Sequence, residues 1–176
     1  MKPKKGIRFA GSLLFLIMAL IAIRHISGVV QKESLRTYKG IEELQKNFEG
    51  LLIPTYFPEF LKWPPSRIVA QKRPYRAIAI ELKDKENNIA LVLTESERED
   101  FRLQTLYIKD PIETLAHDIK GRKAILRVGS CSPVLKPAET KICSNLSWKE
   151  GDYYINITIK SRPFELLKIA ESMIHN

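Results

Sequence analysis

The amino-acid sequence predicts an α+β fold, in which an antiparallel sheet of about six strands carries helices on one face and follows a single N-terminal transmembrane segment. Three observations lead to this prediction. Short runs of β-branched, aliphatic and aromatic residues recur beyond residue 66. Segments with apolar residues at helical spacing precede, interrupt and follow these runs. A run of fifteen residues without a charge, 9–23, lies near the N-terminus.

The composition is that of one globular domain with an appendage. The chain has 176 residues, of which 44% are apolar and 28% are charged, and these shares exclude wholesale disorder. Eight Gly and ten Pro residues exclude a collagen-like or low-complexity chain. Two Cys residues exclude a disulfide-dense miniprotein and a zinc site with four cysteine ligands.

The net charge of +9 is concentrated at the N-terminus. Residues 1–28 contain five basic residues and no acidic residue, which leaves 24 basic and 20 acidic residues, a net charge of +4, for 29–176. The excess of basic residues is therefore a feature of the terminal segment rather than of the domain. We expect no nucleic acid partner for a domain that is only mildly basic.

Residues 1–28 are predicted to form a cytoplasmic tail and a signal anchor, although a cleaved secretory signal is the alternative. Cleavage requires small residues around the cut, and the cuts after Ala22 and after Gly28 both place a large residue at the outer recognition position. As an anchor, the charge-free run spans about 22 Å of a hydrocarbon core about 30 Å thick. Extension to Val30 supplies the missing length and places Arg24 near the outer end, so we favour the anchor.

The basic tail also predicts the orientation in the membrane. Four basic residues lie within the first eight positions: Lys2, Lys4, Lys5 and Arg8. Because positively charged tails stay on the cytoplasmic side, we expect a single-pass protein of the cytoplasmic membrane with its N-terminus in the cytoplasm. The membrane is then one partner of the chain, and the domain beyond the anchor is extracytoplasmic, or periplasmic.

The domain itself is predicted at 41–176, behind a polar juxtamembrane linker at 29–40. The linker has no strong hydrophobic period. The first element of the domain is a short amphipathic helix at 41–52, in which apolar residues recur at helical spacing: Ile41, Leu44, Phe48 and Leu51.

An aromatic–proline segment follows at 53–66. Its four prolines prevent a regular helix or a central strand. The segment also contains four of the fifteen aromatic residues of the chain: Tyr56, Phe57, Phe60 and Trp63. These four rings are the candidate binding surface for a peptide, lipid or protein partner. The alternative is that they close one end of the sheet as part of the core.

Strand-like segments occupy most of the remaining chain. They are bounded by polar or Gly-containing turns, and the first is short: 67–72, 75–82, 89–94, 101–108, 122–128, 141–149 and 153–160. A loop with two prolines lies at 130–139, and Gly151 lies in the last hairpin connection. The order of these strands and the helices predicts an antiparallel sheet with the helices packed on one face.

Two further helices are predicted. Asp110 and Pro111 suit the first positions of a helix, Glu113 is in the capping-box position, and Gly121 stops the helix. The last helix is predicted at 162–175. Five residues form its apolar side: Phe164, Leu167, Ile169, Ala170 and Ile174.

No catalytic or metal site is predicted, and we expect no cofactor. Glu113 and His117 lie four residues apart on the predicted helix, a spacing that can supply two metal ligands. A site also needs a third ligand, so a surface Glu–His pair is the simpler interpretation. The sequence contains no glycine-rich phosphate loop, no nucleophile elbow and no zinc-protease motif.

The two cysteines, Cys131 and Cys143, are twelve residues apart on either side of a loop between two strands. Outside the cytoplasm such a pair most simply forms a disulfide. Two free buried thiols are the alternative. A nucleophilic Cys131 with His117 as its base is a further possibility, although nothing in the sequence singles out His117 for that role.

The C-terminal stretch resembles a known group of domains. It contains Trp148, the turn residue Gly151 and Tyr154 on the returning strand, followed by the helical sequence ELLKIAES at 165–172. This pattern resembles the C-terminal unit of a bacterial extracytoplasmic domain family of uncharacterised function. The sequence IPTYFP at 53–58 resembles the tyrosine–proline motif of the same domains.

The resemblance implies a location and an architecture rather than a reaction. It covers residues 50–174, and its motifs are structural, with no catalytic residues to transfer. The family occurs in membrane-anchored proteins, including some with anti-sigma-factor segments or with similarity to lipoprotein-carrier-like folds. The short tail before the charge-free run cannot form a sigma-binding domain, so we expect no direct anti-sigma role.

Together these observations favour a non-enzymatic, membrane-tethered extracytoplasmic domain that acts in the cell envelope through a protein or lipid partner. The alternative is a carrier or sensor that binds an apolar ligand in a cavity between the sheet and the helices. A large apolar cavity would favour the carrier, and a filled core with exposed aromatic rings would favour the binding domain. An enzyme that uses Cys131 or His117 is the third possibility.

Overall fold

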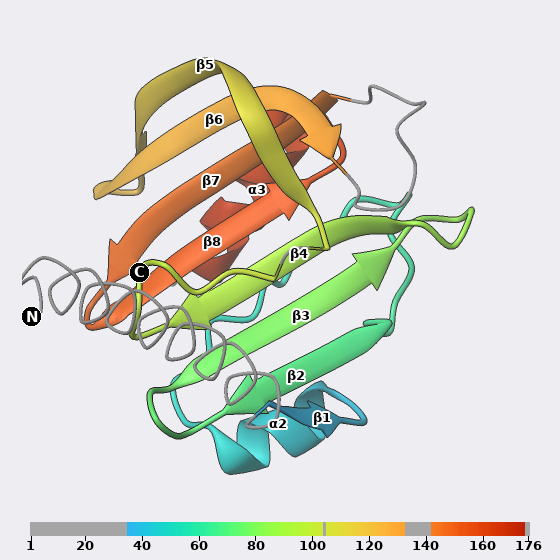
Figure 1. Cartoon of the computed structure of the whole chain (residues 1–176), viewed down its shortest axis with the longest axis vertical. Coiled ribbons are helices and arrows are strands. Elements are labelled where there is room, and N and C mark those ends of the chain that lie inside the picture. The colour runs from blue at the N-terminus through green and yellow to red at the C-terminus, as the bar shows by residue number, and fades with distance from the viewer. Residues whose placement is uncertain (1–34, 104, 133–141, 175–176) are drawn as a thin grey trace, which may run out of the picture. The chain divides into compact units, whose positions relative to one another are not determined.

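The computed structural model describes residues 35–103, 105–132 and 142–174 (Figure 1). The predicted tail and anchor, 1–28, lie outside these ranges, together with the first half of the linker and most of the proline-containing loop at 130–139. Within the described ranges, no helix is long and apolar enough to cross a membrane.

The fold is built on one sheet of eight strands in the order β1-β2-β3-β4-β8-β7-β6-β5 (Figure 1). All neighbouring pairs from β2 to β5 in this order are antiparallel. The last strand in the chain, β8, lies between β4 and β7 and so joins two sequential sets of strands. The strands are β1 (Arg36–Tyr38), β2 (Arg67–Gln71), β3 (Ala77–Lys83), β4 (Ile89–Ser96), β5 (Tyr107–Ile119), β6 (Arg122–Ser132), β7 (Ile142–Glu150) and β8 (Tyr153–Ile159).

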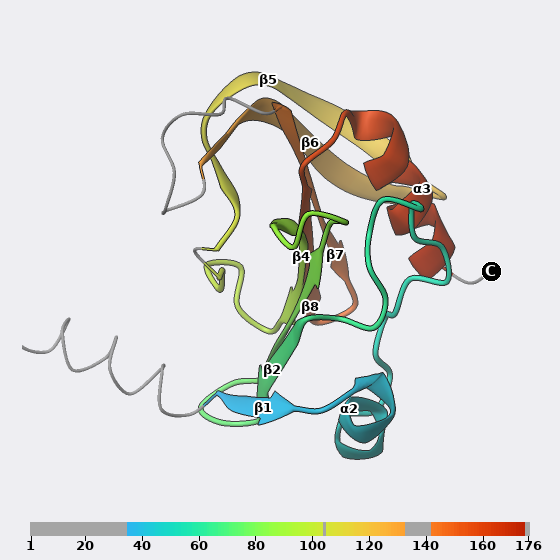
Figure 2. The same ribbon diagram turned by 90° about the vertical axis from the view of Figure 1, so that its right-hand side faces the viewer.

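Two helices, α2 (Ile41–Asn47) and α3 (Pro163–Met173), contribute buried residues to the same core cluster. Figure 2 shows α3 and the chain between α2 and β2 on one side of the sheet, which we call the helix face. The predicted α+β class is therefore confirmed. The strand count is different, since the described residues form eight strands rather than about six.

The two helices also differ in detail from the prediction. Helix α2 ends at Asn47, ahead of Gly50, whose positive φ of 67° turns the chain away from the helix axis. Helix α3 begins at Pro163 and buries Leu166, Ile169, Ala170 and Met173. Phe164, which the helical pattern placed on the apolar side, is 65% exposed.

The predicted helix at 110–121 is wrong, because Tyr107–Ile119 forms the edge strand β5, paired with β6. Apolar residues at 112, 115, 116 and 119 fit a helical period, but the alternation of Leu115, His117 and Ile119 fits a strand equally well. Gly121 does not stop a helix. With Lys120 it forms the tight β5–β6 turn, in which both residues have positive φ, 48° and 84°.

Two other segments of the prediction need correction. The strand β1 lies within residues 29–40, which we predicted to be a linker. The predicted strand at 101–108 is wrong for most of its length, because residues 101–103 and 105–106 form loop and turn. This connection between β4 and β5 packs on the sheet face opposite the helices, where Leu106 joins a small buried cluster with Val92. The hydroxyl of Thr105 donates a hydrogen bond to Glu81 there, at 2.9 Å.

The main core lies on the helix face, where rows of opposed residues cross the sheet. One row is apolar on seven consecutive strands: Ile68, Ile80, Leu93, Ile157, Leu146, Leu126 and Leu115. We call these residues the apolar row. The first six are buried, but the last, Leu115 on β5, is 47% exposed. The apolar row is therefore covered along the sheet and open at the β5 edge.

Candidate interaction surface

The four rings of the predicted binding surface are placed in two different environments. Tyr56, Phe57 and Phe60 are partly buried and pack against the main core. Trp63 is 55% exposed, and the centre of its ring lies 5.0 Å from that of Phe57. Three of the rings therefore contribute mainly to packing, and Trp63 is the exposed ring among the four.

Tyr56 attaches the aromatic–proline segment to α3. Its N–H donates a hydrogen bond to the Ser172 hydroxyl at 3.2 Å, and its phenol donates one to Glu165 Oε2 at 2.7 Å. The bond to Glu165, with smaller contributions from burial and from the negative charges of Glu165 and Glu59, raises the pKa of the Tyr56 phenol. The phenol therefore stays protonated and keeps its role as a donor at neutral pH.

The space between this segment and the sheet is almost filled. A cavity of only about 10 Å³, enough for one water-sized molecule, remains between apolar side chains. Its lining comes from α2, from the aromatic–proline segment and from β3 and β4: Ile41, Ile53, Pro54, Phe57, Trp63, Ile80, Leu82, Leu91 and Leu93. A lipid or other large apolar ligand could enter only if these side chains moved apart.

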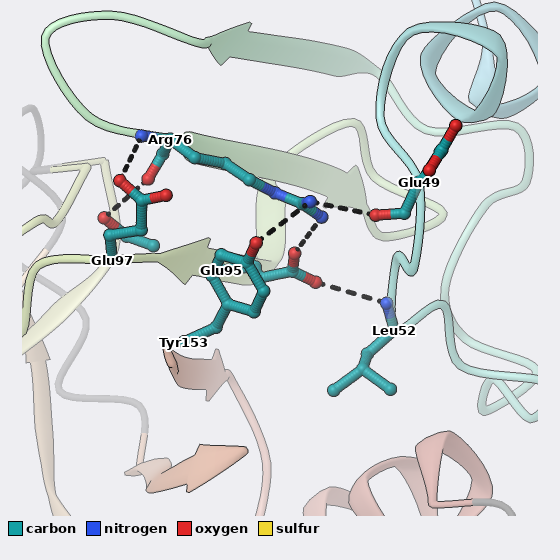
Figure 3. A network of polar contacts seen from close by, with 7 residues as sticks. Glu49, Leu52, Arg76, Glu95, Glu97 and Tyr153 are labelled. Carbon is teal, nitrogen blue, oxygen red and sulfur yellow. Dashed lines mark hydrogen bonds and ion pairs between the residues drawn. The ribbon is translucent and has the colours of Figure 1, made fainter. Parts of the chain in front are cut away.

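A buried ion pair lies at one end of strands β3 and β4 (Figure 3). Arg76 Nη2 lies 2.6 Å from Glu95 Oε1, and the two side chains are only 15% and 2% exposed. The guanidinium also lies over the ring of Tyr153, 4.4 Å from its centre. A charge pair this deeply buried must be well paired to be tolerated.

The same ion pair holds the chain that leads into the aromatic–proline segment. Arg76 Nη1 donates a hydrogen bond to the backbone oxygen of Glu49 at 2.9 Å, and Glu95 Oε2 accepts one from the N–H of Leu52 at 3.2 Å (Figure 3). Both contacts lie just before residue 53. The pair therefore has a structural role, because its polar atoms are directed at this protein's own backbone.

The predicted disulfide between Cys131 and Cys143 is confirmed. It joins β6 to β7 with a Cα–Cα distance of 5.1 Å, and both residues are buried. The alternative of two free thiols is therefore wrong for this structure. Cys131 is also not close to His117, since His117 lies opposite Ala124, seven residues or about 23 Å along β6 from Cys131.

Glu113 and His117 are related by a strand rather than by a helix. They lie on the same face of β5, but four residues along a strand separate them by about 13 Å. Such a separation is too large for two ligands of one metal ion. In the described part of the chain, no group of three His, Cys, Asp or Glu residues is arranged to hold a metal ion.

The free edge of β5 is the surface that sequence reasoning missed. Among the described strands β5 has one neighbour, β6, and residues 109–116 of β5 are all exposed. They include the apolar side chains of Ile112 and Leu115, which are 82% and 47% exposed. The signal that could have revealed this edge is the pair Lys120-Gly121 after an alternating stretch, which is typical of a hairpin turn.

The two halves of this edge differ in regularity. The pairing of β5 with β6 shifts register between Ile108 and Pro111 and again between Pro111 and Glu113, whereas 113–119 is regular. Gly129 permits the close approach at the irregular half, because a Cβ there would lie 2.6 Å from Ile108 and 2.8 Å from the Asp110 oxygen. Bulges and a proline blunt the irregular half, so the regular half is the part that can accept a further strand.

The chain matches no protein-family model, and neither curated sequences nor solved structures gave a significant match. The resemblance of the C-terminal stretch to a bacterial extracytoplasmic family therefore stays a prediction.

Proposed function

We propose that this chain is a non-enzymatic, membrane-tethered extracytoplasmic domain that binds a protein partner by strand addition at the edge of β5. The observation that carries this proposal is the exposure of residues 109–116 on an edge strand of thirteen residues. The unpaired N–H and C=O groups of such an edge bind another strand, and exposed side chains such as Ile112 and Leu115 add specificity.

The proposed location is supported by two features. The basic residues of the first eight positions favour a cytoplasmic N-terminus. The disulfide between Cys131 and Cys143 is a bond that persists mainly in oxidising compartments, such as the periplasm. Both features are expected of a domain that is held outside the cytoplasmic membrane.

The small volume of the described cavity between the aromatic–proline segment and the sheet supports a binding domain over a carrier. The cavity of about 10 Å³ offers no space for an apolar ligand of lipid size. Cys131 and His117, the residues considered for catalysis, are far apart, and Cys131 is consumed in the disulfide. The exposed edge of β5 therefore remains as a surface feature that has no role inside the domain.

Photo-crosslinking from position 112 tests the proposed contact. A photoreactive phenylalanine analogue at Ile112 of the full chain, in its native membranes, is expected to give a discrete protein adduct on irradiation. The matched control carries the same group at Lys85, an exposed residue of the β3–β4 turn, and is expected to give none. Absence of any adduct from position 112 would overturn the proposed binding function.

The proposed location has its own test. A reporter active only outside the cytoplasm is fused to the C-terminus of the full chain and is expected to be active. The same reporter at the N-terminus is the control and should be inactive. The opposite result would place the domain in the cytoplasm and contradict the proposed orientation.

A further inference from the structure

We infer that the partner at the β5 edge is a second copy of this chain, which adds its own β5 in antiparallel orientation about a two-fold axis at Leu115. This inference rests on the proposed function, because it names the partner for the same edge. Three features of β5 support it: the registers that strand geometry allows, the charges along the edge and the open end of the apolar row.

Strand geometry limits the registers in which two copies of β5 can pair. In an antiparallel pair, directly opposed residues both turn their backbone N–H and C=O groups either towards the other strand or away from it. Within the regular stretch 113–119, these groups alternate in direction from one residue to the next. The two-fold axis must therefore lie at a position where a residue is directly opposite its own copy. It cannot lie midway between two successive residues of the strand.

Charge then distinguishes among these registers. An axis at Glu113 or at Asp118 would place two carboxylates directly opposite each other, and like charges in that position are destabilising. An axis at Ile119, the last residue of β5, would leave most of the regular stretch unpaired. An axis at Thr114 or Ala116 leaves Glu113 opposite an apolar residue, and an axis at His117 opposes two imidazoles. Only an axis at Leu115 places Glu113 of each copy opposite His117 of the other. This register forms two Glu–His pairs and one central Leu–Leu pair.

The open end of the apolar row is the third supporting feature. It crosses seven strands on the helix face and ends at Leu115, which lies directly opposite the buried Leu126. Pairing about Leu115 places the same residue of the second copy next in the row. The two rows then form one continuous apolar stripe, and the exposed area of Leu115 is buried.

The other edge of the sheet is less suited to this role. It is formed by β1, which has only three residues, Arg36–Tyr38. A strand this short offers few backbone groups to another chain. The seven regular residues of β5 from Glu113 to Ile119 are thus the longer free template among the described strands.

Cysteine crosslinking tests the register directly. Opposed Cα atoms in an antiparallel pair are about 4.5–5.5 Å apart, within the range that a disulfide bridges. Full chain in detergent micelles with Leu115→Cys is therefore expected to form a species of twice the monomer mass under mild oxidation, at least tenfold more than with Ile112→Cys. Ile112 is the more exposed of the two, so equal yields from both positions would indicate random collision and overturn the register.

Charge reversal tests the Glu–His pairs. His117→Glu places four carboxylates along the contact and is expected to reduce association of the full chain by at least tenfold in analytical ultracentrifugation. Adding Glu113→His restores opposite partners and is expected to recover association. Circular dichroism checks that both variants fold, and failure of the double variant to recover while folded would overturn the pairing.

The crosslinking from position 112 separates this inference from the proposed function. Adducts of twice the monomer mass support a second copy as the partner. Adducts of another mass, with a monomeric protein in ultracentrifugation, overturn the second copy while leaving the proposed binding function intact. The absence of all adducts overturns both.

Discussion

At the residue scale, the buried carboxylate of Glu95 holds a connecting segment of the chain against the sheet. The Glu95 side chain is 2% exposed and bridges Arg76, the residue before β3, and the backbone of Leu52, so it links the sheet to the chain before the aromatic–proline segment. Neither Arg76 nor Glu95 stands out in the sequence, because charged residues are common at the ends of strands. Their pairing depends on the register of β3 and β4, in which Ile78 lies opposite Glu95.

We expect Glu95→Gln to lower the free energy of unfolding by about 3 kcal/mol, because it leaves the Arg76 guanidinium buried without its counter-charge. Urea unfolding followed by circular dichroism measures the change. Glu42→Gln is the matched control, since Glu42 is exposed on the first turn of α2, and its effect should stay within about 0.5 kcal/mol. Equal effects of the two substitutions would contradict the structural role of the pair.

A second residue-scale prediction concerns the raised pKa of Tyr56. The contact with Glu165 stabilises the fold while the phenol is protonated, so its contribution is complete below pH 10 or so and is lost as the pH rises through the pKa of the folded state. Absorbance titration near 295 nm, as a difference between the natural chain and Tyr56→Phe, isolates this phenol. We expect its ionisation to shift to lower pH in Glu165→Gln, and an unchanged midpoint would argue against the hydrogen bond.

At the scale of elements, the different exposure of the two tryptophans indicates different roles for the segments that contain them. Trp63 of the aromatic–proline segment is 55% exposed, whereas Trp148 of β7 is 4% exposed. We expect Trp63→Ala to lower the free energy of unfolding by about 1 kcal/mol and Trp148→Ala by about 4 kcal/mol. Chemical denaturation measures both. A loss from Trp63→Ala as large as that from Trp148→Ala would show that Trp63 is needed mainly for packing.

The contribution of the disulfide between β6 and β7 to stability can also be tested. Cys131 and Cys143 are separated by twelve residues, so the bond restricts the unfolded chain by about 3 kcal/mol in the loop-entropy account. We expect the double variant Cys131→Ala, Cys143→Ala to unfold at a lower temperature than the natural protein. A thiol reductant should lower the midpoint of the natural protein and leave that of the variant unchanged, and an insensitive natural protein would contradict the prediction.

At the scale of the whole molecule, the sheet joins two sets of strands through the contact of β4 with β8. These two strands have neighbours on both edges, and their buried residues belong to the main core. The outer strand β5 has only β6 beside it among the described strands. The protection of backbone N–H groups against hydrogen exchange should therefore decrease from the centre of the sheet towards β5.

Hydrogen exchange followed by mass spectrometry tests this gradient on the full chain. At low protein concentration, peptides from β4 and β8 should exchange most slowly, and peptides from β5 should exchange faster than those from β6 and β7, because half of the N–H groups of β5 point away from β6. At higher concentration the exchange of 113–119 should slow if the edge pairs with a second copy. Exchange of β5 as slow as that of β8 in dilute solution would contradict the open edge.

Much of the fold could be predicted because local patterns and packing agree. Alternating or continuous apolar runs marked β2, β3, β4, β7 and β8, and the helical period of α3 identified Ile169 and Ala170 on its buried side but missed Leu166 and Met173. The spacing of Cys131 and Cys143 on flanking strands indicated their bond. In each case a short stretch of sequence carries the whole signal, so no distant contact was needed to interpret it.

The sequence by itself determined the α+β class, the disulfide and the segment that holds the four aromatic rings, because each depends on residue types at short spacing. Only the tertiary structure decided which rings remain exposed, how Arg76 and Glu95 meet, and that 107–119 is an edge strand. In that stretch the helical and alternating periods coincide at Leu115 and Ile119, and Asp110-Pro111 suits the start of either element. Pairing with β6 removes the ambiguity, because backbone hydrogen bonds between strands depend on residues that lie apart in the sequence.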